Sequence, residues 1–312
     1  MLTMKSLVTA GSALCGVLLL SASAYAQVVE VKQVFGKLEE VPAVAWKASA
    51  SAGFSISTGN ASVTTLSGGF MASRNDGTNK IALGLKGIYG LTDLSAFTDG
   101  NGNMVADNDT ELEVTRKTTA ALLLGTFRYD RFFSKSNSGY ITASAGLDSP
   151  ASKRFMGGGQ IGYARQIVNT KMHLLSAELG YDFNYTNYVT PEVAPAGFTE
   201  NVLLHSARIF AGYILSVADH TTVEANVEAL INFNVAHIGD RDVGAGQATR
   251  VNGQLAFTTK VWKALSLRAS SMLRYNNAPG LTTLFPFAPD FAGRYNQKLD
   301  TLTELQLVVN FI

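Results

Sequence analysis

The sequence predicts an all-β protein, a transmembrane antiparallel up-and-down β-barrel of about 12 strands. Three observations predict this fold class. Apolar and polar residues alternate along most of the chain, the connections between the alternating segments are sorted by length, and aromatic residues recur near the segment ends. Helical periodicity is not sustained anywhere after residue 26.

The amino terminus has the order of a cleavable secretory signal peptide, with Lys5, a short apolar stretch and the small-x-small triplet AYA at 24–26. The apolar stretch is too short for a comfortable membrane-spanning helix. Cys15 lies in the middle of this stretch rather than at its end, which argues against lipidation. We expect a signal peptide at 1–26, a periplasmic or lumenal segment at 27–44 and an outer-membrane barrel at 45–312.

Charge and cysteine content exclude several classes of function. The chain has 25 Lys and Arg against 24 Asp and Glu, and loss of residues 1–26 removes one lysine and the single cysteine. The rest of the chain is therefore formally neutral, which argues against a nucleic-acid partner. Without cysteine it has no disulfide framework, thiolate metal site or thiol nucleophile. We expect no cofactor.

The segment VEANVEALINF at 223–233 shows the alternation most clearly. Its odd positions are apolar, and its even positions are glutamate or asparagine, interrupted only by Leu230. In an extended chain these two sets lie on opposite faces. A soluble sandwich would turn the apolar face toward a core, and a membrane barrel would turn it toward lipid. The same pattern recurs near residues 46–57, 174–188 and 298–311.

Turn residues divide the chain into twelve predicted strands. In the second, Gly68-Gly69 weakens the pattern, and in the fourth Leu122-Leu123-Leu124 breaks the alternation. The predicted strands cover roughly residues 45–57, 61–74, 80–91, 113–132, 140–148, 154–167, 173–187, 202–215, 222–233, 249–261, 265–276 and 298–311.

The lengths of the connections favour a membrane barrel, because such barrels have short periplasmic turns and longer external loops. If the amino terminus is periplasmic, every even-numbered connection is periplasmic, and all of these are short. Four of the six odd-numbered connections are long, at 92–112, 188–201, 234–248 and 277–297. The other two, at Gly59-Asn60 and around Pro150, are short.

Aromatic residues near the strand ends are typical of the two interfacial girdles of such a barrel. The predicted periplasmic girdle contains Tyr129, Phe132, Phe133, Tyr140, Tyr163, Tyr213, Trp262 and Phe311. The predicted external girdle contains Tyr89, Tyr185, Tyr188, Phe233 and Tyr275.

Most strand charges share the inward parity, which avoids the cost of about 2–4 kcal/mol for a lipid-facing Lys or Arg at mid-membrane. About twelve strands lies between the eight that side chains fill and the sixteen that leave a channel. The opposed charges therefore either pair and close the lumen or line a narrow wet pore. The candidate lumen-facing residues are Lys47, Glu178, Asp182, Arg208, Glu224, Glu228, Arg250, Arg268, Arg274 and Glu304.

Four stretches together resemble the salt-induced outer-membrane proteins, a bacterial family of unknown function. They are GFSISTGNA at 53–61, the run from RYDRFF to GYARQ at 128–166, LGYDFNY at 179–185 and KLDTLTELQLVVNF at 298–311. The resemblance covers residues 45–312. It implies an outer-membrane barrel and an association with salt response, with no activity or catalytic residue to carry over. Outer-membrane barrels usually end on an aromatic residue, whereas here Phe311 is followed by Ile312.

Other chemistry is poorly supported. His205-Ser206 is the nearest pair for a lipase, but adjacent strand residues point to opposite faces. In the acidic loop at 98–113, Met104 stands where a calcium loop needs glycine. The apolar loop at 281–295 could constrict the lumen, contact the outer leaflet or pack on other loops, and we favour packing.

The leading expectation is a narrow passive pore for ions or small solutes, linked to salt or osmotic conditions. The alternative is a closed structural or adhesive barrel whose external loops bind a partner or lipopolysaccharide. We expect no enzyme activity. The expected partners are outer-membrane lipid and lipopolysaccharide, the barrel assembly machinery during insertion, and no nucleic acid.

Overall fold

The computed structural model describes residues 44–57, 62–97, 112–149, 151–190, 194, 197–218, 220–280 and 298–311. The predicted signal peptide, the segment after it, most of the acidic loop and the whole apolar loop lie outside these residues. Within the described ranges, no helix is long and apolar enough to span a membrane.

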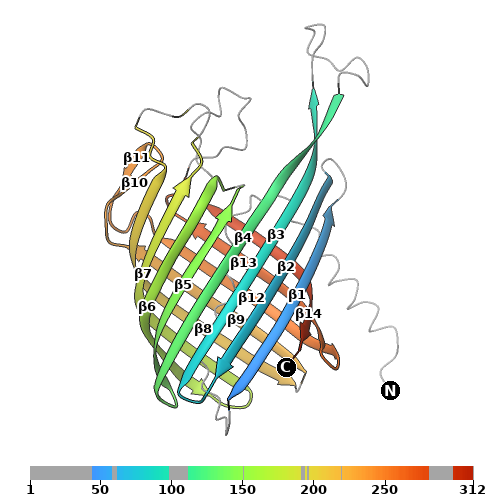
Figure 1. Cartoon of the computed structure of the whole chain (residues 1–312), viewed down its shortest axis with the longest axis vertical. Helices are drawn as coiled ribbons and strands as arrows, with labels where there is room; N and C mark the ends of the chain where they lie inside the picture. Colours follow the sequence, from blue (N-terminus) through green and yellow to red (C-terminus); the bar gives the residue numbers. More distant parts are fainter. Residues whose placement is uncertain are drawn as a thin grey trace.

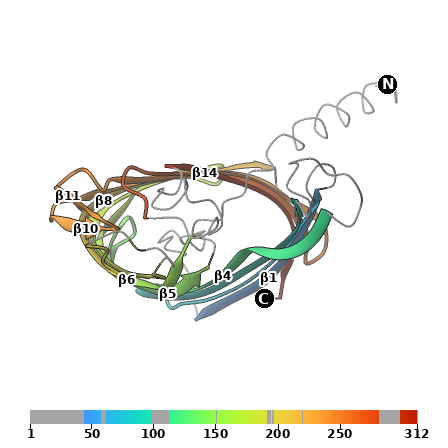
Figure 2. The ribbon, with the colours of Figure 1, turned by 90° about the horizontal axis from the view of Figure 1, so that it is seen from above.

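Twelve of the strands in the described residues close one antiparallel barrel, in which each strand neighbours the next in sequence (Figure 1). The predicted fold class is confirmed. The barrel strands are β1 (Ala45–Ser57), β2 (Ser62–Asn75), β3 (Asn79–Phe97), β4 (Leu112–Ser134), β5 (Asn137–Asp148), β6 (Lys153–Asn169), β7 (His173–Tyr188), β8 (Asn201–Ala218), β9 (Thr221–Asn232), β12 (Arg250–Trp262), β13 (Leu265–Asn276) and β14 (Leu299–Asn310). Seen from above, the wall is a closed, flattened ring (Figure 2).

Two regions predicted as loops contain further strand. Residues 91–97 of β3 pair with residues 112–118 of β4, so this hairpin rises beyond the rest of the ring (Figure 1). In the predicted external loop at 234–248, β10 (Ala236–Ile238) and β11 (Arg241–Val243) form a separate two-stranded hairpin. A three-residue strand is too short for alternation to reveal it in the sequence.

The barrel is apolar outside and polar inside, as a transmembrane barrel requires. On the outer face Leu179 is 60% exposed, whereas its neighbour Glu178 is 2% exposed. The three leucines of β4 follow the same alternation although all are apolar. Leu123 is on the outer face, and Leu122 and Leu124 are buried on the inner face. The apparent break in the sequence pattern is therefore an apolar patch inside the barrel.

Three aromatic residues assigned to the girdles point inward instead. Phe132, Tyr140 and Tyr188 are buried, whereas Trp262 is 67% exposed. Phe132 and Tyr140 share the parity of the buried polar residues on their own strands, and strand parity determines the direction of a side chain whatever its chemistry. The girdle prediction was wrong for these three positions.

The turn between β2 and β3 illustrates the tight connections at one end of the barrel. Gly77 has a φ of 84°, which glycine adopts without strain. The Asp76 carboxylate accepts hydrogen bonds from the backbone N–H groups of Asn79, at 2.7 Å, and Thr78, at 3.1 Å. These bonds lower the pKa of Asp76 below its ordinary value.

Closure of the ring depends on a short seam. All 13 residues of β1 have a partner on β2, but its ladder with β14 joins only Ser49–Gly53 to Gln306–Asn310. A backbone bond from Phe311 N–H to the Ala48 carbonyl, at 2.9 Å, extends the contact at one end.

Candidate functional site in the barrel lumen

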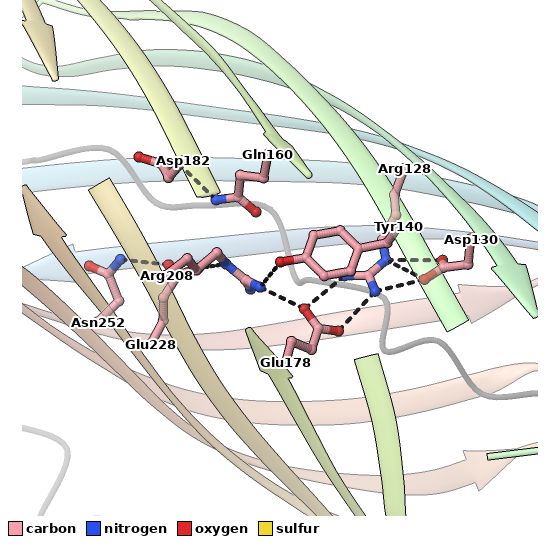
Figure 3. A network of polar contacts seen from close by, with 9 residues as sticks. All are labelled: Arg128, Asp130, Tyr140, Gln160, Glu178, Asp182, Arg208, Glu228 and Asn252. Atoms are coloured by element: carbon pink, nitrogen blue, oxygen red, sulfur yellow. Dashed lines mark hydrogen bonds and ion pairs between the residues drawn. The ribbon is translucent and has the colours of Figure 1, made fainter. Parts of the chain in front are cut away.

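A network of buried charges crosses the lumen from β4 to β9 (Figure 3). Arg128 donates to both oxygens of Asp130, at 2.7–3.1 Å, and to both oxygens of Glu178, at 2.8 and 3.2 Å. Arg208 donates to Glu178 Oε2 at 2.7 Å, an oxygen that it shares with Arg128, and to Glu228 at 2.5 Å. Glu178 therefore bridges two arginines that come from strands on either side of it.

The network is almost fully removed from water. The Arg208 side chain is 0% exposed, and those of Asp130 and Glu178 are 1% exposed. Ions without hydration are tolerated when they are paired and hydrogen-bonded. Here two guanidinium groups meet three carboxylates, so every charge in the network has an opposite partner within hydrogen-bond distance.

Tyr140 lies at the centre of this network. Its hydroxyl accepts a hydrogen bond from Arg208 at 2.8 Å, and the guanidinium carbon of Arg128 is 4.5 Å from its ring centroid. The ring fits because two neighbouring inward positions are glycine. A Cβ on Gly162 would lie 2.6 Å from the Tyr140 hydroxyl oxygen, and one on Gly180 would lie 2.5 Å from it. The two glycines thus form the surface on which the tyrosine rests.

A second chain of contacts continues along the same wall. Asp182 accepts hydrogen bonds from Gln160, at 3.0 Å, and from Arg250, at 2.9 Å. Asn252 donates to Glu228 at 3.0 Å and so joins β12 to the network (Figure 3).

A separate set of ion pairs joins β3 to β14 and β13 to β9. Lys86 of β3 lies 2.9 Å from Glu304 of β14, and Arg268 of β13 lies 3.1 Å from Glu224 of β9. Arg274 donates to the thioether sulfur of Met272 at 3.3 Å. A thioether is a weak acceptor.

The structure brings nine of the ten candidate residues into these two groups. The tenth, Lys47, is exposed on β1. Sequence reasoning omitted Arg128, Asp130 and Tyr140 from the candidates, although the spacing in RYD at 128–130 places Arg128 and Asp130 on one face of β4. Lys86, one of the strand charges with inward parity, also lies in the second group.

Among the described residues, two cavities lie in the lumen. The first, of about 170 Å³, reaches Lys153, Arg250 and Asn276, which lie at the strand ends on the side of the barrel that carries the long connections. The second, of about 230 Å³, reaches Ser266 and Asn310, which lie at the end with the tight turns.

An apolar group lies between the polar surfaces of the lumen. Met71 borders both cavities. It packs, with Met272 and Leu302, against a buried cluster that includes Leu124 and Met156. Methionine and leucine side chains from both walls therefore meet within the barrel.

At the end with the long connections, an apolar cluster includes residues of the β10–β11 hairpin, which we call the ledge. The cluster contains Tyr188, Val202, Leu204, Ala236, Ile238, Val243, Ala248 and Ala278. His237 on the ledge lies 2.8 Å from Asp242 through Nδ1 and 2.9 Å from the Gly197 carbonyl through Nε2. The Asp242 carboxylate, with the Gly197 carbonyl, raises the pKa of His237 above its ordinary value.

The two residues considered for a lipase lie apart. His205 is on the outer face, where its Nδ1 lies 2.5 Å from the Tyr181 hydroxyl, and Ser206 is fully buried on the inner face. Among the described residues, no group of three or more His, Cys, Asp and Glu side chains could hold a metal ion. The calcium question concerns residues outside the described ranges.

The fold and the lumen define a transmembrane β-barrel with a charged, partly filled interior. The chain belongs to the family described as "Protein of unknown function, DUF481", whose model matches residues 50–311. The predicted membership of a family of unknown function is confirmed.

No curated protein matches the chain. Solved structures with a similar fold include the NanC porin, with 9% identity, 85% coverage of this chain, 97% of that one and a TM-score of 0.41. The translocator domain of the autotransporter NalP from Neisseria meningitidis shows 11% identity, 86% and 87% coverage, and a TM-score of 0.41. OmpT of Vibrio cholerae shows 8% identity, 86% and 99% coverage, and a TM-score of 0.36. These similarities are too distant to support any inference about function.

Proposed function

We propose that this protein is an outer-membrane pore that lets ions or small polar solutes pass along its lumen. An outer-membrane location is supported by the apolar outer face and by tight turns at one end with long connections at the other. We attribute no catalytic step to the protein.

The observation that carries this proposal is that Met71 borders two cavities with polar and charged residues in their lining, one toward each end of the barrel. Polar walls can hold water and replace part of the hydration of a small ion. Met71 has an unbranched, flexible side chain, so rotamer changes can open or close the contact between the cavities. Passage through the pore then depends on the apolar group around Met71, since apolar constrictions gate by excluding water.

Single-channel recording tests the proposal. The full-length protein, purified from membranes and reconstituted in a planar bilayer, should give stable conductance steps. A Met71→Ser variant should give larger steps, because a short polar side chain both widens and wets the constriction. Met172→Ser is the matched control: Met172 is an exposed turn residue, so its replacement should leave the steps unchanged. Silent recordings from both folded wild type and folded Met71→Ser would overturn the proposal.

The second candidate function is a closed barrel whose external surface binds a partner or lipopolysaccharide. The buried network around Glu178 favours it, because complete pairing of the charges fills that side of the lumen. The ledge around Ile238 also favours it, since a rigid external surface suits binding. Silent recordings together with lipopolysaccharide binding that is lost when 236–243 is replaced by a Gly-Ser linker would support this function.

The link to salt and osmotic conditions, implied by the family resemblance, belongs to the same proposal. A strain lacking the protein should adapt more slowly to a shift in NaCl concentration than its parent, and plasmid-borne wild type should restore adaptation. Insertion by the barrel assembly machinery is also proposed.

A further inference from the structure

We infer that the outer face of β4 to β6, at the end with the tight turns, binds the phosphate group of an anionic phospholipid. The site consists of Arg131 and Arg165 with the rings of Phe133 and Tyr163, and these four residues are called the basic patch. The inference requires the outer-membrane barrel but not the pore, because the patch lies on the outside of the wall.

Charged residues are distributed unevenly over the outer face. In the strand halves next to the tight turns, outward positions of β2, β4 and β6 carry Arg74, Arg131 and Arg165. Among the described residues, the outward positions of β1, β7, β8, β9, β12, β13 and β14 carry no Lys, Arg, Asp or Glu. An outward arginine is tolerated where its long side chain reaches the headgroups. The three arginines therefore mark one side of the ring for contact with headgroups.

Carboxylates of the described residues do not neutralise the basic patch. Asp76, in the turn after β2, accepts hydrogen bonds from Arg74, at 3.2 Å, and from the backbone of its own turn. Arg131 donates to an amide oxygen, that of Asn79, at 2.8 Å. The Arg165 side chain has no partner in the described part of the chain. Since a guanidinium has five N–H donors, both patch arginines keep donors for a ligand.

The outer faces of β4 and β6 repeat one order of side chains. From the middle of the strand toward the tight turns, this order is Phe127, Tyr129 and Arg131 on β4, and Ile161, Tyr163 and Arg165 on β6. Each set places an exposed apolar side chain first and the charge last. A phospholipid has the same order, from acyl chain through glycerol to phosphate.

The two tyrosines place this order at the membrane interface. The Tyr129 hydroxyl donates to Asn79 at 2.8 Å, and the Tyr163 hydroxyl donates to Asn137. Both asparagines are the first residues of their strands, directly after a tight turn. The hydroxyls therefore point away from the membrane interior, as those of interfacial tyrosines do.

The space between the two patch arginines is apolar and open. Gly139 of β5 lies between Arg131 and Tyr163 in the ladder, so β5 contributes no side chain there. The Phe133 ring packs over this glycine, where a Cβ would lie 3.1 Å from it, and the residue is 69% exposed. An exposed ring beside two arginines suits the glycerol and upper acyl region of a lipid whose phosphate binds the guanidinium groups.

The charges of the patch favour an anionic lipid over a zwitterionic one. A guanidinium binds a phosphate through paired, charge-assisted hydrogen bonds. A zwitterionic lipid also carries an ammonium group, which would need a carboxylate. The outward positions of β4, β5 and β6 at this end provide none among the described residues.

Native mass spectrometry of the barrel purified from membranes tests the inference without requiring conduction. The probes are dioleoyl phosphatidylglycerol and dioleoyl phosphatidylcholine, which differ in the headgroup alone. We expect the wild type to retain phosphatidylglycerol about fivefold or more over phosphatidylcholine, since each arginine near an anionic surface contributes a factor of about five. Arg131→Gln combined with Arg165→Gln should abolish this preference.

The matched control is Arg154→Gln combined with Lys263→Gln, which removes the same charge from exposed positions outside the patch and should keep the preference. Both double variants should be as stable as the wild type in phosphatidylcholine vesicles, because all four side chains are exposed. Equal retention of the two lipids by the wild type, or equal loss of the preference in the two double variants, would overturn the inference. A wild-type dimer without lipid preference that separates in the patch variant would also overturn it, and would assign the patch to self-association.

Discussion

Replacing Arg208 by glutamine should destabilise the barrel more than replacing Glu178 by glutamine, although the two side chains form one ion pair. Arg208 is the only described side chain that bridges Glu178 and Glu228, at 2.7 and 2.5 Å. Its loss removes the ion pair that each of these two carboxylates makes with it, while Arg128 still contacts Glu178. Loss of the Glu178 charge leaves two arginines facing two carboxylates, which are already paired as Arg128 with Asp130 and Arg208 with Glu228.

The magnitudes follow from this charge count. Breaking a buried ion pair so that charges stay unpaired costs about 3–5 kcal/mol, and Arg208→Gln is such a change. In Glu178→Gln the amide oxygen can still accept from one arginine, so the cost is that of one lost charged hydrogen bond, about 1.5–3 kcal/mol. An exposed substitution such as Arg131→Gln should change stability by about 0.5 kcal/mol or less.

Urea unfolding in phospholipid vesicles measures these differences. Trp46 and Trp262, both on the outer face, report the transition by fluorescence. The slope of the free energy against urea should stay constant across the variants, so that midpoints compare directly. A Glu178→Gln cost equal to or larger than that of Arg208→Gln would refute the reasoning from charge balance.

Two further predictions concern single sites. Gly162→Ala should cost about 1–3 kcal/mol in the same assay, because the added methyl group would lie 2.3 Å from a backbone oxygen and 2.6 Å from the Tyr140 hydroxyl. Gly87→Ala is the control, because Gly87 has space around it. Equal costs for the two variants would contradict the close packing at Gly162. His237 should titrate above 6.5 by NMR, and Asp242→Asn should lower its pKa. Because the pKa of His237 is raised on folding, the ledge should be most resistant to protease below pH 6.5 and should lose this added resistance as the pH rises through the folded pKa. A pKa at or below 6.5 would contradict the contact between His237 and Asp242.

The sequence predicted the fold because a barrel is determined by local features. Alternation along each strand separates a lipid face from a lumen face, and Glu224 and Glu228 could be assigned inward from their spacing alone. Strand order followed from the short turns. Leu230, the one apolar residue at an inward position of the segment 223–233, is also buried.

The pairing of charges inside the lumen could not be predicted in the same way. Arg128 and Glu178 are 50 residues apart on strands that are not neighbours, and their contact depends on the stagger of every strand between them. If the pairing of two strands shifted by two residues, every side chain would still point to the same face, but the charged residues would meet different partners. Tyr140 was assigned to the wrong face because its chemistry was weighed above its parity.

The short seam between β1 and β14 has a consequence for the order of folding. Each of the other ladders joins strands that follow one another along the barrel, so it can form as a hairpin or as an addition to one. The seam instead joins Ser49 to Asn310, across nearly the whole chain. Contacts of such high sequence separation carry the largest loop-closure entropy and form slowly. With a ladder of only five residue pairs to offset that entropy, we expect closure of the ring to be a late step of assembly.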